Sequence, residues 1–280
     1  MPFRLRRPTA PPAAPPGPPE RFTRPSAAAF LSFVVVAAFV VHGWVGGVAL
    51  RPADLAEGVG RLGEFLAEAF PPDLDRVGAI ASALLVTFEI ALLGTLIGVL
   101  LSVPLAVAAA RNTTPNRLVY LVTRGFVSVC RTIPDLVWAL IFVVAVGLGP
   151  QAGVLAVAVD VLGLCGRFFA EAIEEVDDGV LEGLRSGGAP ERAVVAGAVL
   201  PTCLPSFAGT SMFALESAVR SSVTIGLVGA GGIGIELSVS MALLRYDEAL
   251  TIILAIFVVV LGVERFSAAL RRRIMEGASR

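Results

Sequence analysis

The stretch EGLRSGGAPERAVVAGAVLP, residues 182–201, is a polar segment between long hydrophobic stretches, and the interpretation of the whole chain depends on it. Connections within helix bundles are normally short, about 2–8 residues, so this longer segment is expected to lie in water and to contact another protein. Its residues suit two helices joined by a turn. Glu182 to Arg185 can end the first helix, and Gly187-Gly188 can supply the turn. Pro190 suits the first turn of a second helix, where Glu191 complements the positive helix start.

The same segment ends at Leu200-Pro201, which marks the expected entry to the next hydrophobic helix. Two interpretations are open at this point. The segment is either a docking element for a partner in water or a plain helix–turn–helix connection between two membrane spans. The pattern alone favours neither, and the flanking sequence must decide.

The composition indicates a membrane protein. The 280 residues are 56% hydrophobic and 16% charged, with a mean hydropathy of +0.82, whereas a soluble domain is about 25% charged. A net charge of -1 argues against a nucleic-acid partner held by a basic face. All 22 basic residues are arginine, so the chain lacks the lysine of a Walker A phosphate loop. A partner must therefore hydrolyse any ATP that the protein uses.

No catalytic residue, metal site or cofactor is expected in the chain. Cys130, Cys165 and Cys203 lie far apart with no CxxC spacing, which favours buried free thiols. His42 is the only histidine, and we interpret it as a packing or interfacial residue.

Hydrophobic runs predict an all-α membrane protein with six transmembrane helices. Residues 1–26 are rich in proline and arginine and are expected to be a disordered tail. Residues 27–50 form the first apolar run, which is long for a cleaved signal peptide and favours a retained helix. Residues 51–78 are polar and are expected to form a loop. Further runs of about the 20 residues that a span requires follow at 79–110, 118–148, 151–169, 198–222 and 249–270.

Arginine placement predicts the orientation, since cytoplasmic loops carry an excess of basic residues. Arginines precede the first run and follow the last, which places both termini and a short tail, 274–280, in the cytoplasm. The segment 182–201 falls on the same side, and the acidic segment 51–78 falls on the outer side. The chain is therefore expected to cross the membrane several times.

Charges inside hydrophobic runs are functional candidates because each is costly in hydrocarbon. Glu216 and Arg220 have the i,i+4 spacing of a helical ion pair. Arg220 can offer a positive field to a passing anion, or the pair can merely lock the helix. Arg131 and Asp135 also fit one helical turn, and we expect a structural pairing there. The third run is expected to begin at the interface and to enter the bilayer near Ile133-Pro134.

A glycine-rich stretch follows the run at 198–222. It lacks the spacing and the βαβ context of a dinucleotide fingerprint, which leaves two interpretations. One is a broken or re-entrant segment near the periplasmic end, where it could help to gate entry, and the other is close helix packing. The glycines concerned are Gly226, Gly229, Gly231, Gly232 and Gly234.

Three stretches carry a resemblance to a known family. The sequences VCRTIPDLVWALIFVVAVGLGPQAGVLAVAV (129–159) and ESAVRSSVTIGLVGAGGIGIEL (216–237) resemble permease subunits of phosphonate ABC importers. The segment 166–201 continues this resemblance into the coupling loop of ABC importer permeases, so that the match covers about residues 80–273. Ala218 and Asp160 depart from the pattern, in which asparagine and histidine are usual.

The resemblance implies a location in the bacterial inner membrane, with the segment 51–78 as a periplasmic loop. It implies that the last five helices form a type I importer core within a homodimeric pore. It also implies a periplasmic binding protein and two copies of a cytoplasmic ATPase, which binds ATP and Mg, so that the permease itself is not an enzyme. The segment 182–201 would dock on that ATPase. The coupling residues are then Glu182, Gly188, Ala189, Pro190, Glu191, Leu200 and Pro201, and the path or gate candidates are Glu216, Arg220, Gly229, Gly231, Gly232, Gly234, Arg131 and Asp135.

Two classes of alternative stand beside this interpretation: a permease for another solute, and a membrane enzyme or a stand-alone channel. A permease of the same architecture for another solute, such as methionine, would differ in the ligand of its binding protein. A membrane enzyme lacks support because no ligand or nucleophile cluster is present. A stand-alone channel would not need the coupling loop.

Overall fold

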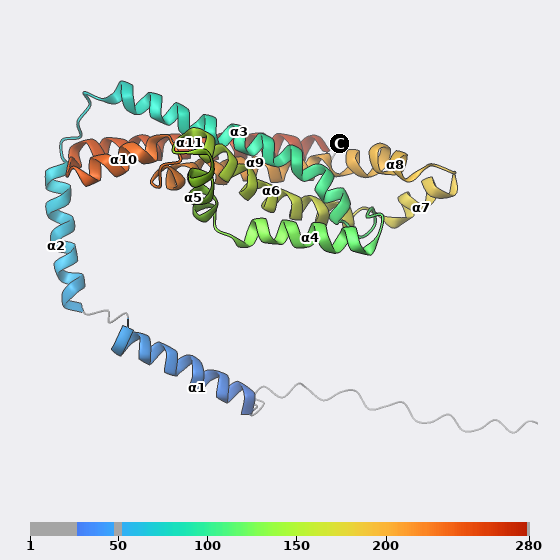
Figure 1. The fold of residues 1–280 in the computed structure, drawn as a ribbon, viewed down its shortest axis with the longest axis horizontal. Coiled ribbons are helices and arrows are strands. Elements are labelled where there is room, and N and C mark those ends of the chain that lie inside the picture. Colours follow the sequence, from blue (N-terminus) through green and yellow to red (C-terminus); the bar gives the residue numbers. More distant parts are fainter. Residues whose placement is uncertain (1–26, 48–51, 279–280) are drawn as a thin grey trace, which may run out of the picture. The chain divides into compact units, whose positions relative to one another are not determined.

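The described part of the chain, residues 27–47 and 52–278 of a computed structural model, consists of helices and the turns between them (Figure 1). The predicted all-α fold is therefore confirmed. The proline-rich tail predicted at 1–26 lies outside the described residues. The chain divides into two units, residues 1–62 and 63–280.

The first unit contains α1 (Ala27–His42), which continues into a π-helical turn at Gly43–Gly47. This helix is apolar on all sides, with no buried residue, and Ala27–Gly46 is long and apolar enough to cross a membrane. A helix that is hydrophobic all round must be buried in protein or lipid. The first predicted span is thus a helix of sufficient length.

The helix α2 (Pro52–Ala69) occupies most of the segment predicted as a polar loop. Its larger apolar residues recur at Leu55, Val59, Leu62 and Leu66, so they share one face. The helix is therefore amphipathic, which is the property of a helix that lies along an apolar surface.

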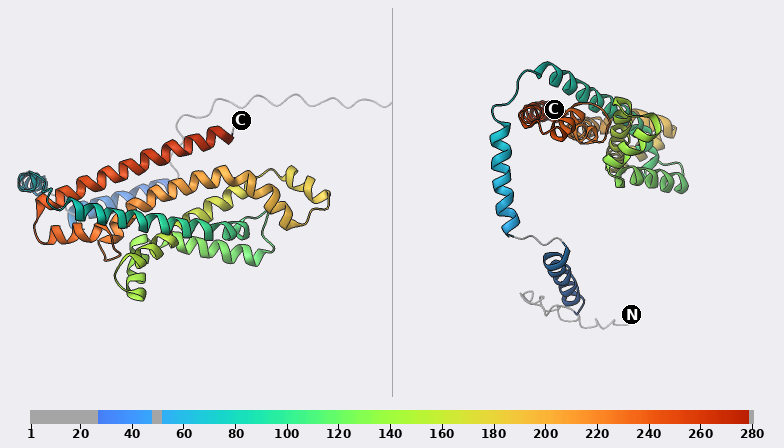
Figure 2. Two further views of the ribbon diagram at one scale, coloured as in Figure 1. Left: turned by 90° about the horizontal axis from the view of Figure 1, so that it is seen from above. Right: turned by 60° about the vertical axis from the view of Figure 1, so that its left-hand side comes forward.

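The second unit is a helical bundle. Its long helices are α3 (Val77–Ala109), α6 (Pro150–Glu174), α9 (Leu200–Gly226) and α11 (Tyr246–Ala278). Between α3 and α6 lie α4 (Arg117–Thr132) and α5 (Asp135–Val146), and the short helices are α7 (Asp178–Ser186), α8 (Glu191–Val194) and α10 (Ile233–Ala242). Among the described helices, five are long and apolar enough to span a membrane, or up to six if α4 and α5 count as one bent span. Figure 2 shows the long helices running alongside one another.

The helix α6 is the most buried of the long helices, and small residues bring α3 close to it. A Cβ added at Gly94 would lie 2.6 Å from Val157, and one added at Gly98 would lie 2.7 Å from Val161. On the α9 side of α6, the rings of Phe169 and Phe207 stack with centroids 4.1 Å apart. The core of the bundle is therefore α6 with α3 and α9.

The predicted third run is broken where the sequence indicated. The helices α4 and α5 meet at 93° at Ile133-Pro134, because proline disfavours a helical conformation in the residue before it and lacks the N–H of a continuing helix. The polar half of the run thus forms a separate amphipathic helix, α4.

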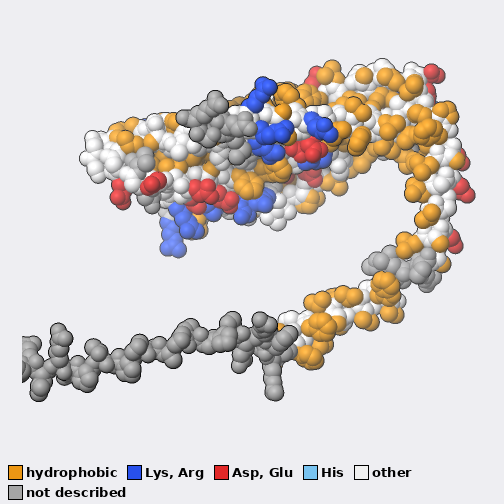
Figure 3. Space-filling view, turned by 180° about the vertical axis from the view of Figure 1, so that it is seen from behind, with side chains coloured by type: hydrophobic (Ala, Val, Ile, Leu, Met, Phe, Trp, Pro, Cys, Tyr) orange, Lys and Arg blue, Asp and Glu red, His pale blue; other side chains and the backbone are white. Residues whose placement is uncertain are grey.

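Charged side chains are unevenly distributed over the bundle. On the face shown in Figure 3, they gather mainly in the half that carries α7 and α8, while hydrophobic side chains predominate in the other half. The α7–α8 end is consequently the more polar end of the bundle.

Candidate functional site

The helix α7 is exposed at one end of the bundle but anchored on one face. The carboxylate of Asp177 accepts a hydrogen bond of 2.7 Å from the backbone N–H of Gly179 and caps the helix start. Leu181 is completely buried, whereas Glu182 beside it is exposed. The apolar side of α7 is thus attached to the bundle, and the side carrying Glu182 is available to a partner.

A glycine turn ends α7, as the sequence predicted. Gly188 has φ +83°, a left-handed conformation that glycine adopts without strain. The N–H groups of Gly188 and Ala189 donate to the carbonyls of Arg185 and Leu184 at 2.9 and 3.2 Å. These bonds satisfy the free carbonyls of the helix end and fix the direction in which the chain leaves α7.

The two short helices are tied to each other by an ion pair. Arg185 of α7 and Glu191 of α8 approach to 2.7 Å, and the hydrogen bond from Arg185 lowers the pKa of the Glu191 carboxyl below its usual value. Arg185 also donates to the backbone carbonyl of Asn112, at 3.2 Å. The α7–α8 element is thereby bonded to the connection between α3 and α4.

The entry to α9 lies at the predicted position, and a π-helical turn precedes it. The helix α8 runs through a π-helical turn, Val195–Val199, into α9, so that Glu191–Gly226 is one helical stretch. The helix α9 begins at Leu200, directly after the π turn, so Leu200-Pro201 is its start within this continuous stretch. Pro201 has no N–H to donate to the residue four positions earlier, and the π turn accommodates that missing bond.

A polar cluster that the sequence did not reveal supports this end of the bundle. Glu174, at the end of α6, accepts hydrogen bonds of 2.9 Å from the guanidinium of Arg124 and from the backbone N–H of Arg111. The side-chain amide of Asn112 donates to the carbonyl of Ile173 at 2.7 Å. The end of α6 and the α3–α4 connection, to which α7 is bonded, form one connected unit.

The two charged pairs predicted inside the membrane have different outcomes. Glu216 and Arg220 approach to 2.9 Å as an i,i+4 pair on α9. The predicted pairing of Arg131 with Asp135 is wrong, because the bend at Ile133-Pro134 separates them. Asp135 instead accepts hydrogen bonds from the Ser221 hydroxyl and from the N–H of Leu136. Arg131 lies over the ring of Phe168, at 5.8 Å from its centroid.

The two positions that depart from the family pattern lie in different environments. Ala218 is buried in α9, so the methyl group fills space in the core where an amide would need a partner. Asp160 is half-buried in α6. Ala218 therefore lies in the interior of the bundle, whereas Asp160 is only partly enclosed.

The glycine-rich stretch forms the tight turn between α9 and α10. Gly229, Gly231 and Gly232 all have positive φ, between +74° and +92°. The N–H of Ile233 donates to the Thr87 hydroxyl of α3 at 2.8 Å. The same turn is bonded to the start of α6, since the N–H of Gly149 donates to the carbonyl of Gly229 at 2.9 Å.

Close packing and chain reversal thus occur together in this stretch. A Cβ on Gly234 would lie 2.3 Å from the carbonyl of Val223 and 2.7 Å from Gly226. A cavity of about 390 Å³ borders the turn, with Glu236 in its wall. The stretch follows the end of α9, whereas α7 and α8 precede its beginning, so the two candidate elements lie at opposite ends of the bundle.

Comparisons with known proteins place this architecture in a family. The model of the family described as "binding-protein-dependent transport system inner membrane component" matches residues 102–276. The phosphite transport system permease protein PtxC of Stutzerimonas stutzeri is 40% identical over 80% of this chain and 81% of its own length. The phosphate-import permease protein PhnE of Mycolicibacterium smegmatis is 38% identical over 85% of this chain and 44% of its own length.

The names of more distant relatives refer to another solute, methionine. The probable D-methionine transport system permease protein MetI of Haemophilus influenzae is 25% identical over 65% of this chain and 92% of that protein. A chain of the inward-facing MetNI methionine ABC transporter superposes with a TM-score of 0.63 at 19% identity, covering 72% of this chain and 99% of that chain. At this identity the structural match shows the fold, which is that of type I ABC importer permeases. The chain therefore belongs to the binding-protein-dependent transport inner-membrane components, in the branch of ABC importer permeases that includes the phosphite and phosphonate permeases.

Proposed function

We propose that this chain is the pore-forming subunit of an ATP-driven importer for phosphonate or a related phosphorus oxyanion. The observation that carries the proposal is the 40% identity to a phosphite permease over 80% of the chain. The methionine permeases are the second candidate, and their lower identity, 25% for the Haemophilus influenzae protein, favours the phosphorus oxyanions. The protein is a multi-pass membrane protein and a transport subunit, not itself an enzyme.

The partners follow from the family. A binding-protein-dependent permease works with a substrate-binding protein and an ATPase. We infer a homodimer of this chain with two ATPase copies, which bind ATP and Mg. The absence of lysine supports this division, since the chain has no residue for a Walker A phosphate contact. We also infer that both termini and α7–α8 face the cytoplasm and that the glycine turn faces the periplasm.

The geometry of α7–α8 supports a role in coupling to the ATPase. Glu182 is exposed on a helix that Leu181 anchors, and the Arg185 bonds connect that helix to α8 and to the α3–α4 connection. Closure of the ATPase dimer would therefore displace α7 together with the ends of α3 and α6. The pore would then change between inward-facing and outward-facing states as packed helices move together.

Uptake into proteoliposomes tests this proposal. The vesicles would contain this chain, its ATPase and its binding protein, with labelled alkylphosphonate, phosphite, phosphate and methionine offered in parallel. ATP-dependent accumulation of phosphorus oxyanions alone is expected. Accumulation of methionine instead would retain the importer architecture and refute the substrate class. Equal movement of all solutes without ATP would indicate a channel.

A further inference from the structure

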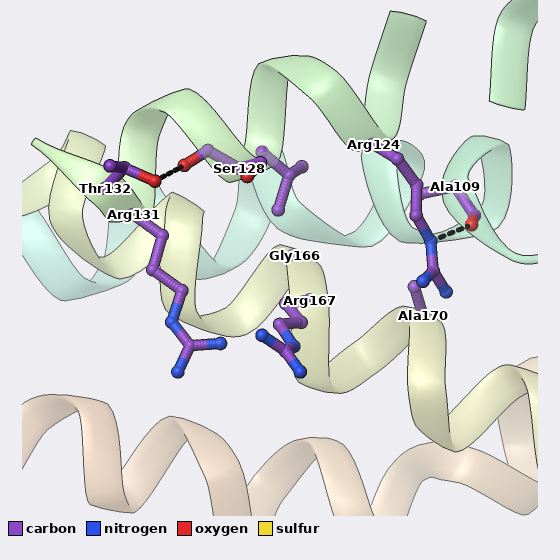
Figure 4. A pocket seen from close by; sticks show the side chains of 9 residues that line it. Ala109, Arg124, Ser128, Arg131, Thr132, Gly166, Arg167 and Ala170 are labelled. Atoms are coloured by element: carbon purple, nitrogen blue, oxygen red, sulfur yellow. Dashed lines mark hydrogen bonds between the residues drawn. The ribbon is translucent and has the colours of Figure 1, made fainter. Parts of the chain in front are cut away.

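A basic cavity of about 480 Å³ lies along α4 and α6, toward the end of α6 that leads into α7. Figure 4 shows the guanidinium groups of Arg131 and Arg167 extending to the same side of α6, with Arg124 farther along. Ser128 and Thr132 add two hydroxyl groups to the wall. None of the residues that line the cavity is a carboxylate.

Helix periodicity and close packing bring these residues together. Arg124, Ser128 and Arg131 have i, i+4, i+7 spacing and share one face of α4. The helices can approach because Gly163 has no side chain; a Cβ there would lie 2.8 Å from the backbone nitrogen of Arg131. Arg167 follows Gly163 by one helical turn on the same face of α6, which places it beside the α4 arginines.

The charges of the cavity are only partly compensated. Arg124 pairs with Glu174 at 2.9 Å, and Arg167 pairs with Glu171 at 2.7 Å. Among the described residues, Arg131 forms no ion pair, and its guanidinium lies over the Phe168 ring at 5.8 Å. The cavity thus has three cations and two bordering carboxylates, so it carries an excess positive charge.

An anion would complete this arrangement. Arg131 is exposed and has no carboxylate partner among the described residues, and the planar guanidinium presents several donors that match the oxygens of a phosphoryl group. The Ser128 hydroxyl makes no hydrogen bond to the described residues, so it is also available as a donor. Thr132 already donates its hydroxyl proton to the carbonyl of Ser128 at 2.7 Å, so it is not a donor for the anion.

We propose that this cavity binds a tetrahedral phosphorus oxyanion, with Arg131 as the main ligand and Arg167 and Ser128 as additional donors. The ligand is either the free anion in transit or the phosphate of a lipid headgroup, which present the same oxygens. If the ligand is the free anion, the proposal rests on the proposed function. It then assigns the transported anion a binding position within the permease, on the side of the coupling helices. The open, partly neutralised wall suits a ligand that must be released again.

Equilibrium binding to the purified permease–ATPase complex in nanodiscs tests the site without the binding protein. Radiolabelled inorganic phosphate is the probe in discs of zwitterionic phosphatidylcholine. Saturable binding is expected for the wild type, and Arg131→Gln should weaken it by about 10-fold to 100-fold, the range for one hydrogen bond to a charged group. Arg131→Lys, which keeps the charge, should lose less. Arg117→Gln is the matched control, because Arg117 is an exposed α4 residue outside the cavity wall.

A second set of discs separates the two sources of the ligand. These discs contain phosphatidylglycerol. The ligand is a lipid phosphate if inorganic phosphate does not bind in phosphatidylcholine discs and if phosphatidylglycerol is retained by the wild type and Arg117→Gln but lost from Arg131→Gln. Absence of both phosphate binding and Arg131-dependent lipid retention would overturn the proposal. Equal binding by wild type and Arg131→Gln would also overturn it, provided that both complexes elute as intact assemblies.

The proposed function is measured separately on the same preparation. If the wild type takes up a phosphorus oxyanion but shows no Arg131-dependent binding, the proposed cavity site is refuted and the proposed function stands. If the complex transports only methionine but shows Arg131-dependent phosphate binding, the proposed substrate class is refuted and the anion site stands.

Discussion

The turn after α7 allows a quantitative test of coupling, because its two glycines differ in backbone conformation. Gly188 has φ +83°, whereas Gly187 has φ -76°. A Cβ at Gly188 would meet nothing within 4 Å, and one at Gly187 would come no closer than 3.4 Å to another atom. Neither Gly187→Ala nor Gly188→Ala therefore creates a clash, so the two variants differ in backbone strain alone.

The left-handed conformation costs a residue with a side chain roughly 1–2 kcal/mol. Gly188→Ala should thus shift the equilibrium away from the native turn by a factor of about 5–30, while Gly187→Ala should have little effect. Asparagine tolerates the left-handed region better than alanine, so Gly188→Asn should retain more activity than Gly188→Ala. Gly188→Asp adds a negative charge to the docking face and is expected to abolish transport.

The assay is ATP-dependent uptake and ATP hydrolysis stimulated by the binding protein, measured in proteoliposomes with equal amounts of each variant. Membrane insertion should be normal for all of them, because the turn is exposed and lies outside the core. Normal uptake by Gly188→Ala would refute the strain argument. Equal losses for the alanine and asparagine variants at Gly188 would mean that any side chain there blocks the partner, and equal losses at both glycines would refute the assignment of the turn.

Three further predictions concern the same assembly. Glu182→Ala should abolish uptake while leaving membrane insertion intact, as measured by uptake and membrane fractionation; normal uptake would contradict the coupling role. Glu191→Gln should weaken coupling by a constant factor between about pH 6 and 8. A carboxyl with a lowered pKa keeps its stabilising charge until the pH falls below the ordinary carboxyl range. A ratio of wild-type to variant uptake that changes between these pH values would contradict the prediction. The double variant Glu216→Arg with Arg220→Glu should have lower uptake than the wild type if Arg220 serves the path. Uptake at the wild-type level would identify Glu216 and Arg220 as a structural pair.

Patterns along the sequence were sufficient for most of the architecture. Hydrophobic runs located the spans, and Pro134 located the bend between α4 and α5. The helix α2 was missed because its charged residues suggested a loop, although Leu55, Val59 and Leu62 follow the helical period. The short helix α10 was not predicted as an element, since the glycines before it indicated only a broken segment.

The site was less accessible to sequence reasoning, because its contacts join distant parts of the chain. The α7–α8 turn could be predicted, since its glycines and proline act locally. The link from Arg185 to Asn112 joins segments that lie 73 positions apart. The Arg131–Asp135 pairing was predicted from helical spacing, and it failed because spacing implies contact only within one continuous helix. The convergence of Arg131 with Arg167 depends on the close approach of α4 and α6 at Gly163, which no local pattern reveals.

The same contacts constrain how coupling can move the bundle. The helices α3 and α6 cannot slide past each other easily, since Gly94 and Gly98 bring them too close for an added Cβ. At the α7 end, Glu174 joins α6 to α4 through Arg124. At the opposite end, Arg76 joins the start of α3 to Glu236 of α10, at 3.3 Å, and to α11. A displacement of α7 should therefore move α3 and α6 as one body. The bend at Ile133-Pro134 is a point where the backbone can change its angle to accommodate this movement.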